Sequence, residues 1–483
     1  MKNQTFIKTC LLGIFAILSS CTTFETDLYV ENLENPDDKI LASDPIALEA
    51  TAASLFRGWY MTVSDYDGPA LALSTMADAT SCSWGNAGMR DLSSEPRVAF
   101  NNTSAYGNNV TRSFFNSLYS TLSDANTIAL AVAEGTEFTE PDLVLSMAKF
   151  SQALTIGYNA LFFDKTWLSD ETGVVGEGPA DYKAAMDFAL NKLDEAIAIA
   201  KSKSFSVPET WTTNAMSSAE LAQLMNAYGA RMLVMNARNK AEKGSIDWNR
   251  VSNYATNAID SDFVINHDDV NWYDLFKTYA VYPGWSRVDL RIISLMDPSY
   301  PDYWPANTTI LPEATSEDAR LATDFQYLNG QNFRPERGEY HYSSYRYSKW
   351  DNYISEWTVP TVEISKTEID MYLAEAKLNT GSLAEAAAII NAGTRTVRGK
   401  LPAVEANATA IANAIHYERM VEMLTDAAGL TFFEMRKEDQ LQKGTLLHFP
   451  IPGSALESIP SDYYTYGGNE GQAGQDYSTG GWR

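Results

Sequence analysis

The sequence predicts a mostly α-helical protein in which helix hairpins form a scaffold for long irregular loops, with few short strands. Apolar residues recur at three-to-four spacing in several long segments, which is the period of one face of a helix. These segments come in consecutive pairs, as expected when two helices pack against each other. With 45% hydrophobic and 20% charged residues among 483, the chain can also bury a large core.

The first twenty residues are predicted to be a lipoprotein signal peptide. Lys2 and Lys8 precede an apolar run over residues 10–18, which is too short to span a bilayer. The small residues before Cys21 are typical of a bacterial lipoprotein cleavage site, so we expect the mature protein to begin with a lipidated Cys21. The alternatives are a transmembrane helix and an ordinary cysteine beside a conventional cleavage site.

Residues 21–44 are expected to form a lipid-anchored tether, because they are rich in Asp and Glu and show no helical period. Acyl chains on Cys21 would hold the rest of the protein at a membrane surface. Residues 45–483 are predicted to fold as a single domain that contains the helix pairs.

Three helix pairs are predicted within this domain, near residues 145–201, 218–260 and 362–398. Single helices are expected over residues 146–167, 181–201, 219–243, 248–260, 362–379 and 383–398. Large aromatic residues and small alanines alternate across these pairs, which is how tetratricopeptide units interlock. We therefore interpret the scaffold as tetratricopeptide-like hairpins separated by long insertions.

The charge balance excludes two classes of ligand. The chain has 62 Asp and Glu residues against 36 Lys and Arg residues, which gives a formal net charge of −26. Nucleic acids and anionic lipid surfaces both require a basic footprint, so neither is expected as the ligand. Cys82 is the only cysteine after Cys21, so we expect no internal disulfide and interpret Cys82 as a small buried side chain.

Several motifs, taken in their order along the chain, resemble the SusD/RagB outer-membrane lipoproteins of Bacteroidota. The helix over residues 361–377 and the later Tyr417-Glu418-Arg419 and Phe432-Phe433-Glu434-Met435-Arg436 segments are similar to the C-terminal part of that family. Further similar segments are the signal peptide and residues 227–231, 254–259, 389–391, 446–452 and 480–482. The chain departs from the family at residues 425–430, which replace a Glu-Gly-Arg/His step, and it lacks the frequent terminal Asn-Pro-Gly.

This resemblance implies a SusD-like fold and a non-catalytic binding protein at the cell surface, with no cofactor. Members of the family form a lid on a SusC-like TonB-dependent transporter in the outer membrane and help to capture nutrients, usually glycans. The resemblance therefore implies three partners: a glycan ligand, the transporter, and outer-membrane lipid through acylated Cys21. Some relatives serve oligopeptide import, so a peptide ligand is the alternative.

A polar, glycine-rich loop over residues 81–91 is the first candidate binding site. An uncharged sugar needs a flat ring for its C–H face and polar groups for its hydroxyls. Trp84 lies among small and polar residues in this loop, where no helix stripe explains it, although it could also fold back over the core. Trp84, Asn86 and Arg90 resemble, in their order, the ligand-binding residues of starch-binding members of the family. Asp78, just upstream, is a further candidate.

The second candidate site lies in an aromatic region over residues 271–357. Its segment 297–305 contains several prolines, so it cannot form the interior of a helix. We expect this segment to present Tyr303 and Trp304 on the surface, where either ring could contact the ligand. Trp285 is a further candidate ligand contact in the same region.

Four tyrosines of this region predict a short β-hairpin with one aromatic face. They alternate with other residues, as the side chains on one face of a strand do. The four residues are Tyr340, Tyr342, Tyr345 and Tyr347. An aromatic face of this kind more often packs against the core than binds a ligand.

The sequence shows no catalytic or metal-binding pattern. A nucleophile elbow, a phosphate loop and a zinc-binding His pair are all missing, and the four histidines are too scattered to indicate a metal site. Glu418 and Glu422 lie one helical turn apart near Arg419, which indicates a solvated or salt-bridged helix face rather than a glycosidase pair. A surface glycoside hydrolase is therefore only a remote alternative.

Overall fold

The computed structural model describes residues 44–82, 88–174, 176–301, 303, 305, 308, 310–329, 342–459, 464 and 476–481. The chain divides into two compact units, Met1–Leu48 and Glu49–Arg483, and the second unit contains the helical scaffold. The predicted signal peptide, Cys21 and residues 22–43 of the predicted tether lie outside the described residues.

Helices account for most of the regular structure, which confirms the predicted fold class. The first half of the chain contains α3 (Pro45–Ser64), α4 (Pro69–Met76), α5 (Met89–Leu92), α6 (Ala105–Ala133), α7 (Pro141–Phe162), α8 (Tyr182–Ser202), α9 (Glu209–Thr212) and α10 (Ser218–Met235). These are followed by α11 (Lys240–Lys243), α12 (Trp248–Thr256), α13 (Leu275–Val281), α14 (Leu290–Met296), α15 (Arg320–Asp324) and α16 (Asp351–Ser355). The last helices are α17 (Lys366–Asn379), α18 (Leu383–Ala392), α19 (Thr394–Val397), α20 (Ala408–Val421), α21 (Leu430–Lys437) and α22 (Gly453–Ser458).

The strands are short, and within the described residues each sheet contains two antiparallel strands. The pairs are β1 (Thr80–Cys82) with β7 (Ser286–Val288), β2 (Lys165–Thr166) with β3 (Ala180–Asp181), β4 (Ser206–Val207) with β5 (Met216–Ser217), β6 (Phe263–Ile265) with β10 (Thr361–Ile364), and β8 (Phe325–Tyr327) with β9 (Tyr345–Tyr347). Several of these pairs join segments that are far apart in the sequence, so the strands fasten the insertions to the helical scaffold.

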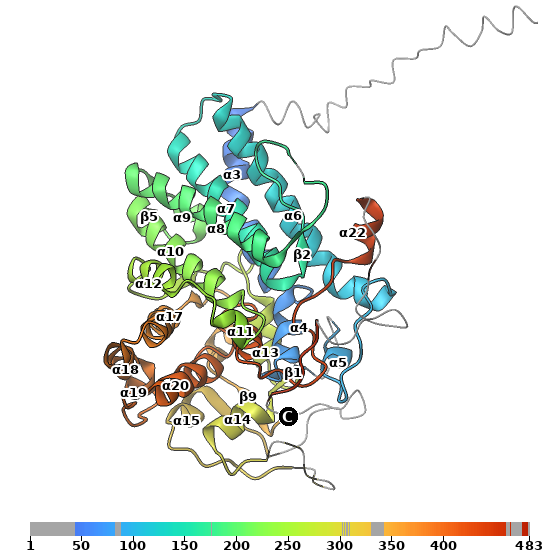
Figure 1. Ribbon diagram of the computed structural model, residues 1–483, viewed down its shortest axis with the longest axis vertical. Coiled ribbons are helices and arrows are strands. Elements are labelled where there is room, and N and C mark those ends of the chain that lie inside the picture. The colour runs from blue at the N-terminus through green and yellow to red at the C-terminus, as the bar shows by residue number, and fades with distance from the viewer. Residues whose placement is uncertain are drawn as a thin grey trace, which may run out of the picture. The chain divides into compact units, whose positions relative to one another are not determined.

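The long helices pack on one another in the order in which they occur along the chain (Figure 1). Helix α6 packs on α7, α7 on α8, α8 on α10, α10 on α12, α12 on α17, and α17 on both α18 and α20. Each predicted helix pair therefore exists and packs against the next pair, as stacked hairpins must do to bury their apolar faces. The tetratricopeptide-like classification of these pairs stays a prediction.

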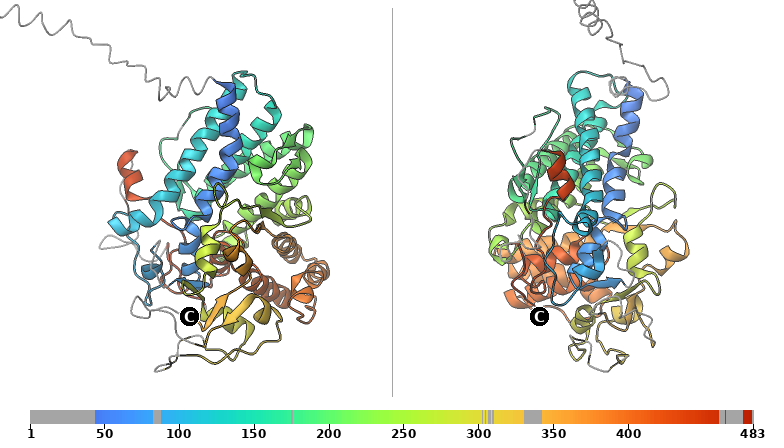
Figure 2. Two further views of the ribbon diagram at one scale, coloured as in Figure 1. Left: turned by 180° about the vertical axis from the view of Figure 1, so that it is seen from behind. Right: turned by 90° about the vertical axis from the view of Figure 1, so that its right-hand side faces the viewer.

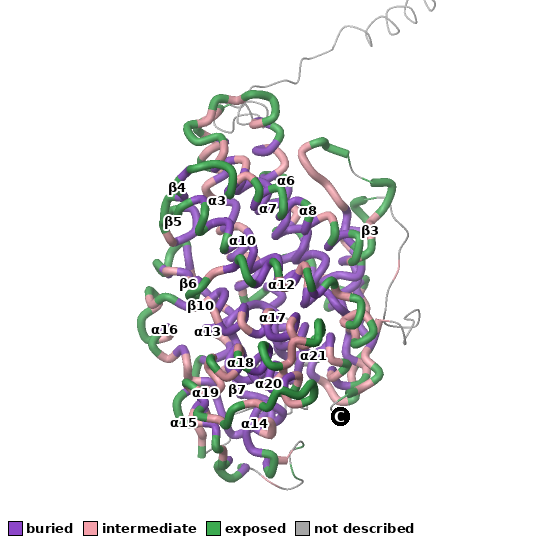
Figure 3. The backbone as a smooth tube through the Cα atoms, turned by 60° about the vertical axis from the view of Figure 1, so that its left-hand side comes forward, coloured by how far each residue is buried: buried purple, intermediate pink, exposed green. Residues whose placement is uncertain are grey.

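The centre of the scaffold is an aromatic core shared by α3, α7 and α10. Trp59 is fully buried, and its ring centroid lies 4.9 Å from that of Tyr158 and 5.3 Å from that of Tyr228. The rings of Phe56 and Phe150 stack at 6.0 Å and extend this core. Figure 2 shows α3, in blue, running beside α6, in cyan, and Figure 3 shows α7 and α10 buried over most of their length.

Several predicted helices end earlier than their apolar period indicated, two of them by six residues or more. The helix expected over 219–243 ends at Met235, and a separate turn, α11, begins where the side chain of Asn239 accepts a hydrogen bond from the backbone N–H of Glu242 at 2.9 Å. The helix expected over 383–398 ends at Ala392, because Gly393 adopts an extended conformation. In both cases the helix ends although the apolar pattern continues. A polar residue then caps a new turn in the first case, and a glycine ends the helix in the second.

The helix predicted to begin at residue 362 begins four residues later. Residues Thr361–Ile364 form β10 instead, and Thr361 lies opposite Ile265 of β6. The side chain of Ser365 then accepts a hydrogen bond from the backbone N–H of Glu368 at 3.1 Å and so caps α17. The β-branched residues before Ser365 favour a strand, and a partner from a distant segment makes that strand possible.

The prediction that the four tyrosines form a hairpin with each other is wrong. The strand β9 pairs with β8, so that Tyr347 lies opposite Phe325 and their ring centroids are 5.2 Å apart. Tyr342 forms only an isolated bridge to another segment, and Tyr340 lies outside the described residues. Tyr345 and Tyr347 are buried, so the expectation that these rings serve packing is confirmed.

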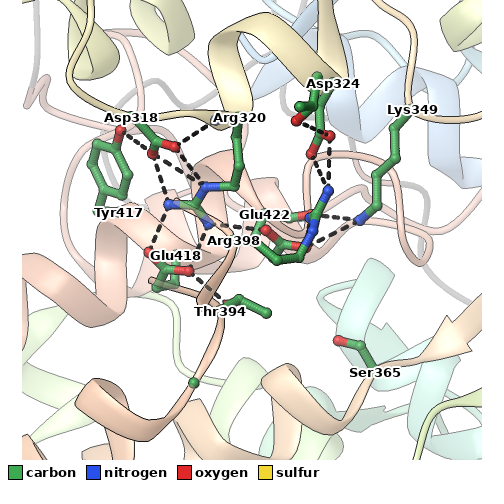
Figure 4. Close-up of polar contacts among 12 residues, drawn as sticks. Asp318, Arg320, Asp324, Lys349, Ser365, Thr394, Arg398, Tyr417, Glu418 and Glu422 are labelled. Carbon is green, nitrogen blue, oxygen red and sulfur yellow. Dashed lines mark hydrogen bonds and ion pairs between the residues drawn. The ribbon is translucent and has the colours of Figure 1, made fainter. Parts of the chain in front are cut away.

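A buried charge network ties the inserted segment around α15 to α20 (Figure 4). The guanidinium of Arg320 is fully buried and lies 2.8 Å from the carboxylate of Asp318. It also lies 2.7 Å from the carboxylate of Glu418 and 2.9 Å from that of Glu422. Arg398 pairs with Glu422 from the other side. Glu418 and Glu422 are therefore salt-bridged and buried rather than solvated, and they do not form an open carboxylate pair.

A second buried ion pair joins successive helix pairs. Arg231 of α10 lies 2.7 Å from Glu363 of β10 and 2.7 Å from Glu368 of α17, and all three side chains are buried. The hydroxyl of Tyr158 in α7 accepts a further hydrogen bond from Arg231 at 3.0 Å. One arginine thus links three helices and a strand of the scaffold.

Candidate ligand-binding site

Four aromatic side chains form a continuous cluster at the surface, which we call the aromatic ledge: Tyr66, Tyr279, Tyr282 and Trp285. The rings of Tyr66 and Tyr279 are nearly parallel, with centroids 5.7 Å apart and an interplanar angle of 17°. The ring of Trp285 lies 4.7 Å from that of Tyr279 and 4.6 Å from that of Tyr282. Tyr66 is 37% exposed and Tyr282 is 36% exposed, so both ends of the ledge face solvent.

The backbone between α13 and β7 brings Tyr282 and Trp285 together. Tyr282 is the C-terminal cap of α13, and the backbone N–H of Trp285 donates a hydrogen bond to the carbonyl of Tyr282 at 3.0 Å. This tight turn contains Gly284 with φ +88°, a conformation that favours glycine over residues with a Cβ atom. The turn therefore fixes the two rings before β7 begins at Ser286.

The pairing of β1 with β7 places the two sequence-predicted regions side by side. Cys82 lies opposite Ser286, and Thr80 lies opposite Val288. Trp285 directly precedes Ser286, so the ledge begins at the end of the sheet where β1 ends at Cys82. Helix α13, which carries Tyr279, also packs against both strands.

The sequence-predicted residues have different positions. Trp285 is half-buried and belongs to the ledge. Tyr303 is 48% exposed, as expected of the proline-rich segment. Trp84, Asn86 and Trp304 lie outside the described residues. Arg90 belongs to the short helix α5, and its side chain also lies outside the described part of the structure. The role of each of these residues in ligand binding stays a prediction.

Asp78 lies in the interior rather than on the binding surface. Its carboxylate forms an ion pair with Arg97 at 2.8 Å, and both side chains are only 3% exposed. The guanidinium of Arg97 also donates a hydrogen bond to the hydroxyl of Thr445 at 2.9 Å. Asp78 therefore belongs to a buried ion pair, and its predicted contact with the ligand is not supported by this position.

Sequence analysis missed three of the four rings of the ledge. Tyr279 and Tyr282 lie in or beside a helix, and Tyr66 follows α3 in a short acidic turn, so none of them stood out as a surface aromatic. The spacing of Tyr279, Tyr282 and Trp285 at intervals of three residues could have indicated a shared face. The contact with Tyr66 could not have been found, because it depends on how distant segments pack.

Acidic groups surround the exposed end of the ledge. The charge of Asp67 and a hydrogen bond to its carboxylate raise the pKa of the Tyr66 hydroxyl. Burial raises the pKa of Asp65, and the neighbouring charge of Asp67 adds to this effect. In the described residues, neither carboxylate forms an ion pair with a Lys, Arg or His side chain. The ledge is therefore a neutral aromatic surface with a negative border.

A larger cavity, of about 630 Å³, lies between α8, α10, α11 and α12. The two cations that line it are already paired, Lys183 with Glu242 at 2.9 Å and Arg250 with Asp194 at 2.9 Å. Its lining combines residues of the helices with residues of the turns between α10 and α11 and between α11 and α12, and no residue of the aromatic ledge lines it. Tyr182 is the aromatic residue of its lining, so the cavity lacks the cluster of rings that the ledge provides.

No cluster of three or more His, Cys, Asp or Glu side chains suited to a metal ion occurs among the described residues. None of the described helices combines the length and apolarity needed to cross a bilayer.

Solved structures with the same fold come from Bacteroidales. A SusD superfamily protein from Parabacteroides distasonis is similar over 88% of this chain and 98% of its own, with a TM-score of 0.61 and 14% identity. A SusD superfamily protein from Bacteroides vulgatus is similar over 86% and 97%, with a TM-score of 0.58 and 13% identity. A SusD-like carbohydrate-binding protein from Bacteroides fragilis is similar over 91% and 95%, with a TM-score of 0.57 and 13% identity. No family model matches the sequence, and no curated protein matches it.

The chain has the same mostly helical fold as these solved structures, since the similarity covers most of this chain and most of each of theirs. That fold is the SusD-like fold, and the fold implied by the sequence motifs is thereby confirmed.

Proposed function

We propose that this protein is a SusD/RagB-type lipoprotein that binds glycans at the cell surface and delivers them to a TonB-dependent transporter in the outer membrane. The observation that carries the proposal is the aromatic ledge, which lies at the surface beside the end of β1. The SusD-like fold supports the proposal, because one structure with this fold is a carbohydrate-binding protein. The motifs that resemble the family support it independently.

The chemistry of the ledge suits a sugar chain. The C–H face of a sugar ring packs against an aromatic face, and its hydroxyls then bond to polar groups around the ring. Tyr66 and Tyr282 each expose more than a third of their surface, while Trp285 between Tyr279 and Tyr282 stiffens the cluster. Rings that pack against one another keep the same arrangement without the ligand. This lowers the entropic cost of ordering the side chains when the ligand binds.

Oligopeptide binding is the alternative function. An extended peptide requires a groove in which free backbone groups pair with its own backbone. The contacts that form the ledge are made by aromatic side chains, which suit the face of a sugar ring rather than a peptide backbone. The structure therefore favours sugar over peptide. The buried, salt-bridged Glu418 and Glu422 do not support a hydrolase function. Assays for reducing sugars released from glycans would test this function directly.

Replacing Tyr282 with Ala should weaken polysaccharide binding by about fivefold, because it removes one exposed ring and about 1 kcal/mol of stacking free energy. Retardation in affinity gels that contain plant, algal or bacterial polysaccharides would measure the change. Tyr282→Phe is the matched control, because it keeps the ring and should bind as the unmodified protein does. Equal retardation of Tyr282→Ala and the unmodified protein in every gel that retards the latter would contradict the assignment of the ledge.

Replacing Cys21 with Ala should release the protein from membranes, because the predicted lipid anchor can no longer form. Fractionation of cells into soluble and membrane material, followed by immunodetection, would measure the distribution. Cys82→Ala is the control, since it removes the other cysteine of the predicted mature chain and leaves the anchor intact. Retention of the Cys21→Ala protein in the membrane fraction would show that another segment holds it there.

A further inference from the structure

A further cavity lies between α6 and α22, and no residue of the aromatic ledge lines it. Figure 1 shows α22, in red, beside α6, and the two helices are in contact. The cavity has a volume of about 470 Å³, which lies within the range of about 300–1,000 Å³ that is usual for small-molecule sites. Its apolar lining is formed by Phe115, Tyr119, Trp167, Ala455 and Ile459.

Three of these residues form a cluster of aromatic rings along one side of the cavity. The ring centroid of Phe115 lies 4.8 Å from that of Tyr119 and 6.5 Å from that of Trp167. Phe115 and Trp167 are buried and Tyr119 is half-buried, so the cluster joins the core to the cavity. Aromatic rings attract a further ring in offset or edge-to-face contact, so this lining suits a ligand that contains an aromatic ring.

Hydrogen bonds fix both sides of the cavity in the absence of a ligand. The hydroxyl of Tyr119 accepts a hydrogen bond from the backbone N–H of Trp167 at 2.7 Å and donates one to the carbonyl of the same residue at 3.0 Å. The hydroxyl of Ser454 in α22 donates a hydrogen bond to the side chain of Asn108 in α6 at 2.8 Å. The cavity therefore exists before binding, which lowers the entropic cost of ordering its side chains.

Arg112 gives the cavity a positive charge. It is exposed, and it is the only charged residue of the lining among the described residues. Its guanidinium forms no hydrogen bond and no ion pair within the described part of the chain. Glu457 of α22 is exposed and does not line the cavity. A cation without a neighbouring acid favours an anionic ligand, even in a chain with a net charge of −26.

We propose that this cavity binds a small aromatic carboxylate. The ring of the ligand packs against the aromatic cluster, and Ile459, which is 42% exposed, supplies an apolar contact from the end of α22. The carboxylate pairs with the guanidinium of Arg112, whose planar N–H groups match the two carboxylate oxygens. This site is separate from the proposed glycan-binding surface and adds a second class of ligand to it.

Three probes of similar size would test the proposal with the full chain: 3-phenylpropanoate, its neutral amide and 3-cyclohexylpropanoate. Saturation-transfer NMR titrations at about 150 mM salt would give the three affinities and limit long-range attraction. We expect 3-phenylpropanoate to bind about fivefold more tightly than the amide, which lacks the charge. It should also bind about threefold more tightly than the cyclohexyl acid, which lacks the aromatic ring. Equal affinities in either comparison, or no binding of 3-phenylpropanoate, would overturn the proposal.

Arg112→Gln should weaken binding of 3-phenylpropanoate by about fivefold and leave binding of the amide unchanged, whereas Arg112→Lys should recover part of the loss. The matched control is Lys201→Gln, which removes the same charge at an exposed position of α8 that does not line the cavity. An equal effect of Arg112→Gln and Lys201→Gln would show that only the net charge matters and would overturn the role of Arg112. Thermal melting would verify that the variants fold.

A further variant tests the place of binding. Ser458→Trp introduces a large side chain at an exposed position of the lining and should abolish binding of 3-phenylpropanoate, because it fills the cavity. Tyr282→Ala should leave this binding unchanged, since Tyr282 belongs to the ledge and does not line the cavity. Binding that survives Ser458→Trp, or that is lost in Tyr282→Ala, would place the ligand elsewhere and overturn the proposal.

Discussion

Replacing Arg320 with Met should lower the free energy of unfolding by about 3–5 kcal/mol. Arg320 is fully buried and is shared by Asp318, Glu418 and Glu422, so the substitution leaves three acids facing one another in the interior (Figure 4). Arg398 still pairs with Glu422 but does not reach the other two carboxylates as a salt bridge. The cost comes mainly from the unpaired buried carboxylates rather than from the lost attraction itself.

Urea unfolding followed by circular dichroism would measure this effect. Arg250→Met is the matched control, because its ion pair with Asp194 is partly exposed and should contribute less than about 1 kcal/mol. The double variant Arg320→Met/Glu418→Gln should recover part of the loss, since it removes one of the carboxylates that lose their cation. If Arg320→Met and Arg250→Met cost the same, the network does not stabilise the fold in the way described.

Replacing Arg231 with Met should also destabilise the protein by about 3–5 kcal/mol, for a related reason. The substitution leaves Glu363 and Glu368 buried without the guanidinium that lies 2.7 Å from each. Because Arg231 connects α10 with β10 and α17, the loss should appear as a weaker junction between successive helix pairs. Hydrogen exchange of backbone amides in α10 and α17, together with urea unfolding, would locate and measure it.

Two further variants divide this effect into its parts. Tyr158→Phe removes one hydrogen bond to Arg231 and should cost only about 1 kcal/mol. Arg231→Met/Glu368→Gln should be more stable than Arg231→Met alone, because one buried charge is removed with its partner. A double variant that is no more stable than the single one would contradict the role of the stranded carboxylates.

The sequence was sufficient to predict the helical scaffold, because each helix carries its own apolar stripe. The pairs near residues 145–201, 218–260 and 362–398 all appear, and they pack in chain order. The ends of helices were less predictable. Helix α17 begins after Ser365, because the residues before it pair as a strand with β6. The local sequence does not indicate a partner that lies about a hundred residues away.

The candidate site was predictable only in part, because a surface is assembled from distant segments. Trp285 was predicted as a candidate ligand contact and lies in the ledge, but the three tyrosines that pack around it were not predicted. Asp78 was expected to contact the ligand, but its carboxylate is buried in an ion pair with Arg97. A polar residue near a candidate site can bind a ligand or form a buried structural ion pair, and sequence alone does not distinguish these two roles.

The ledge draws one ring from the turn after α3 and the others from α13 and the turn before β7. A short peptide with the sequence of either segment would contain aromatic side chains but would not form the surface to which a ligand binds. Recognition is thus a property of the completed tertiary structure. Ligand capture can accordingly serve as an assay of correct folding, even for substitutions introduced far from the rings.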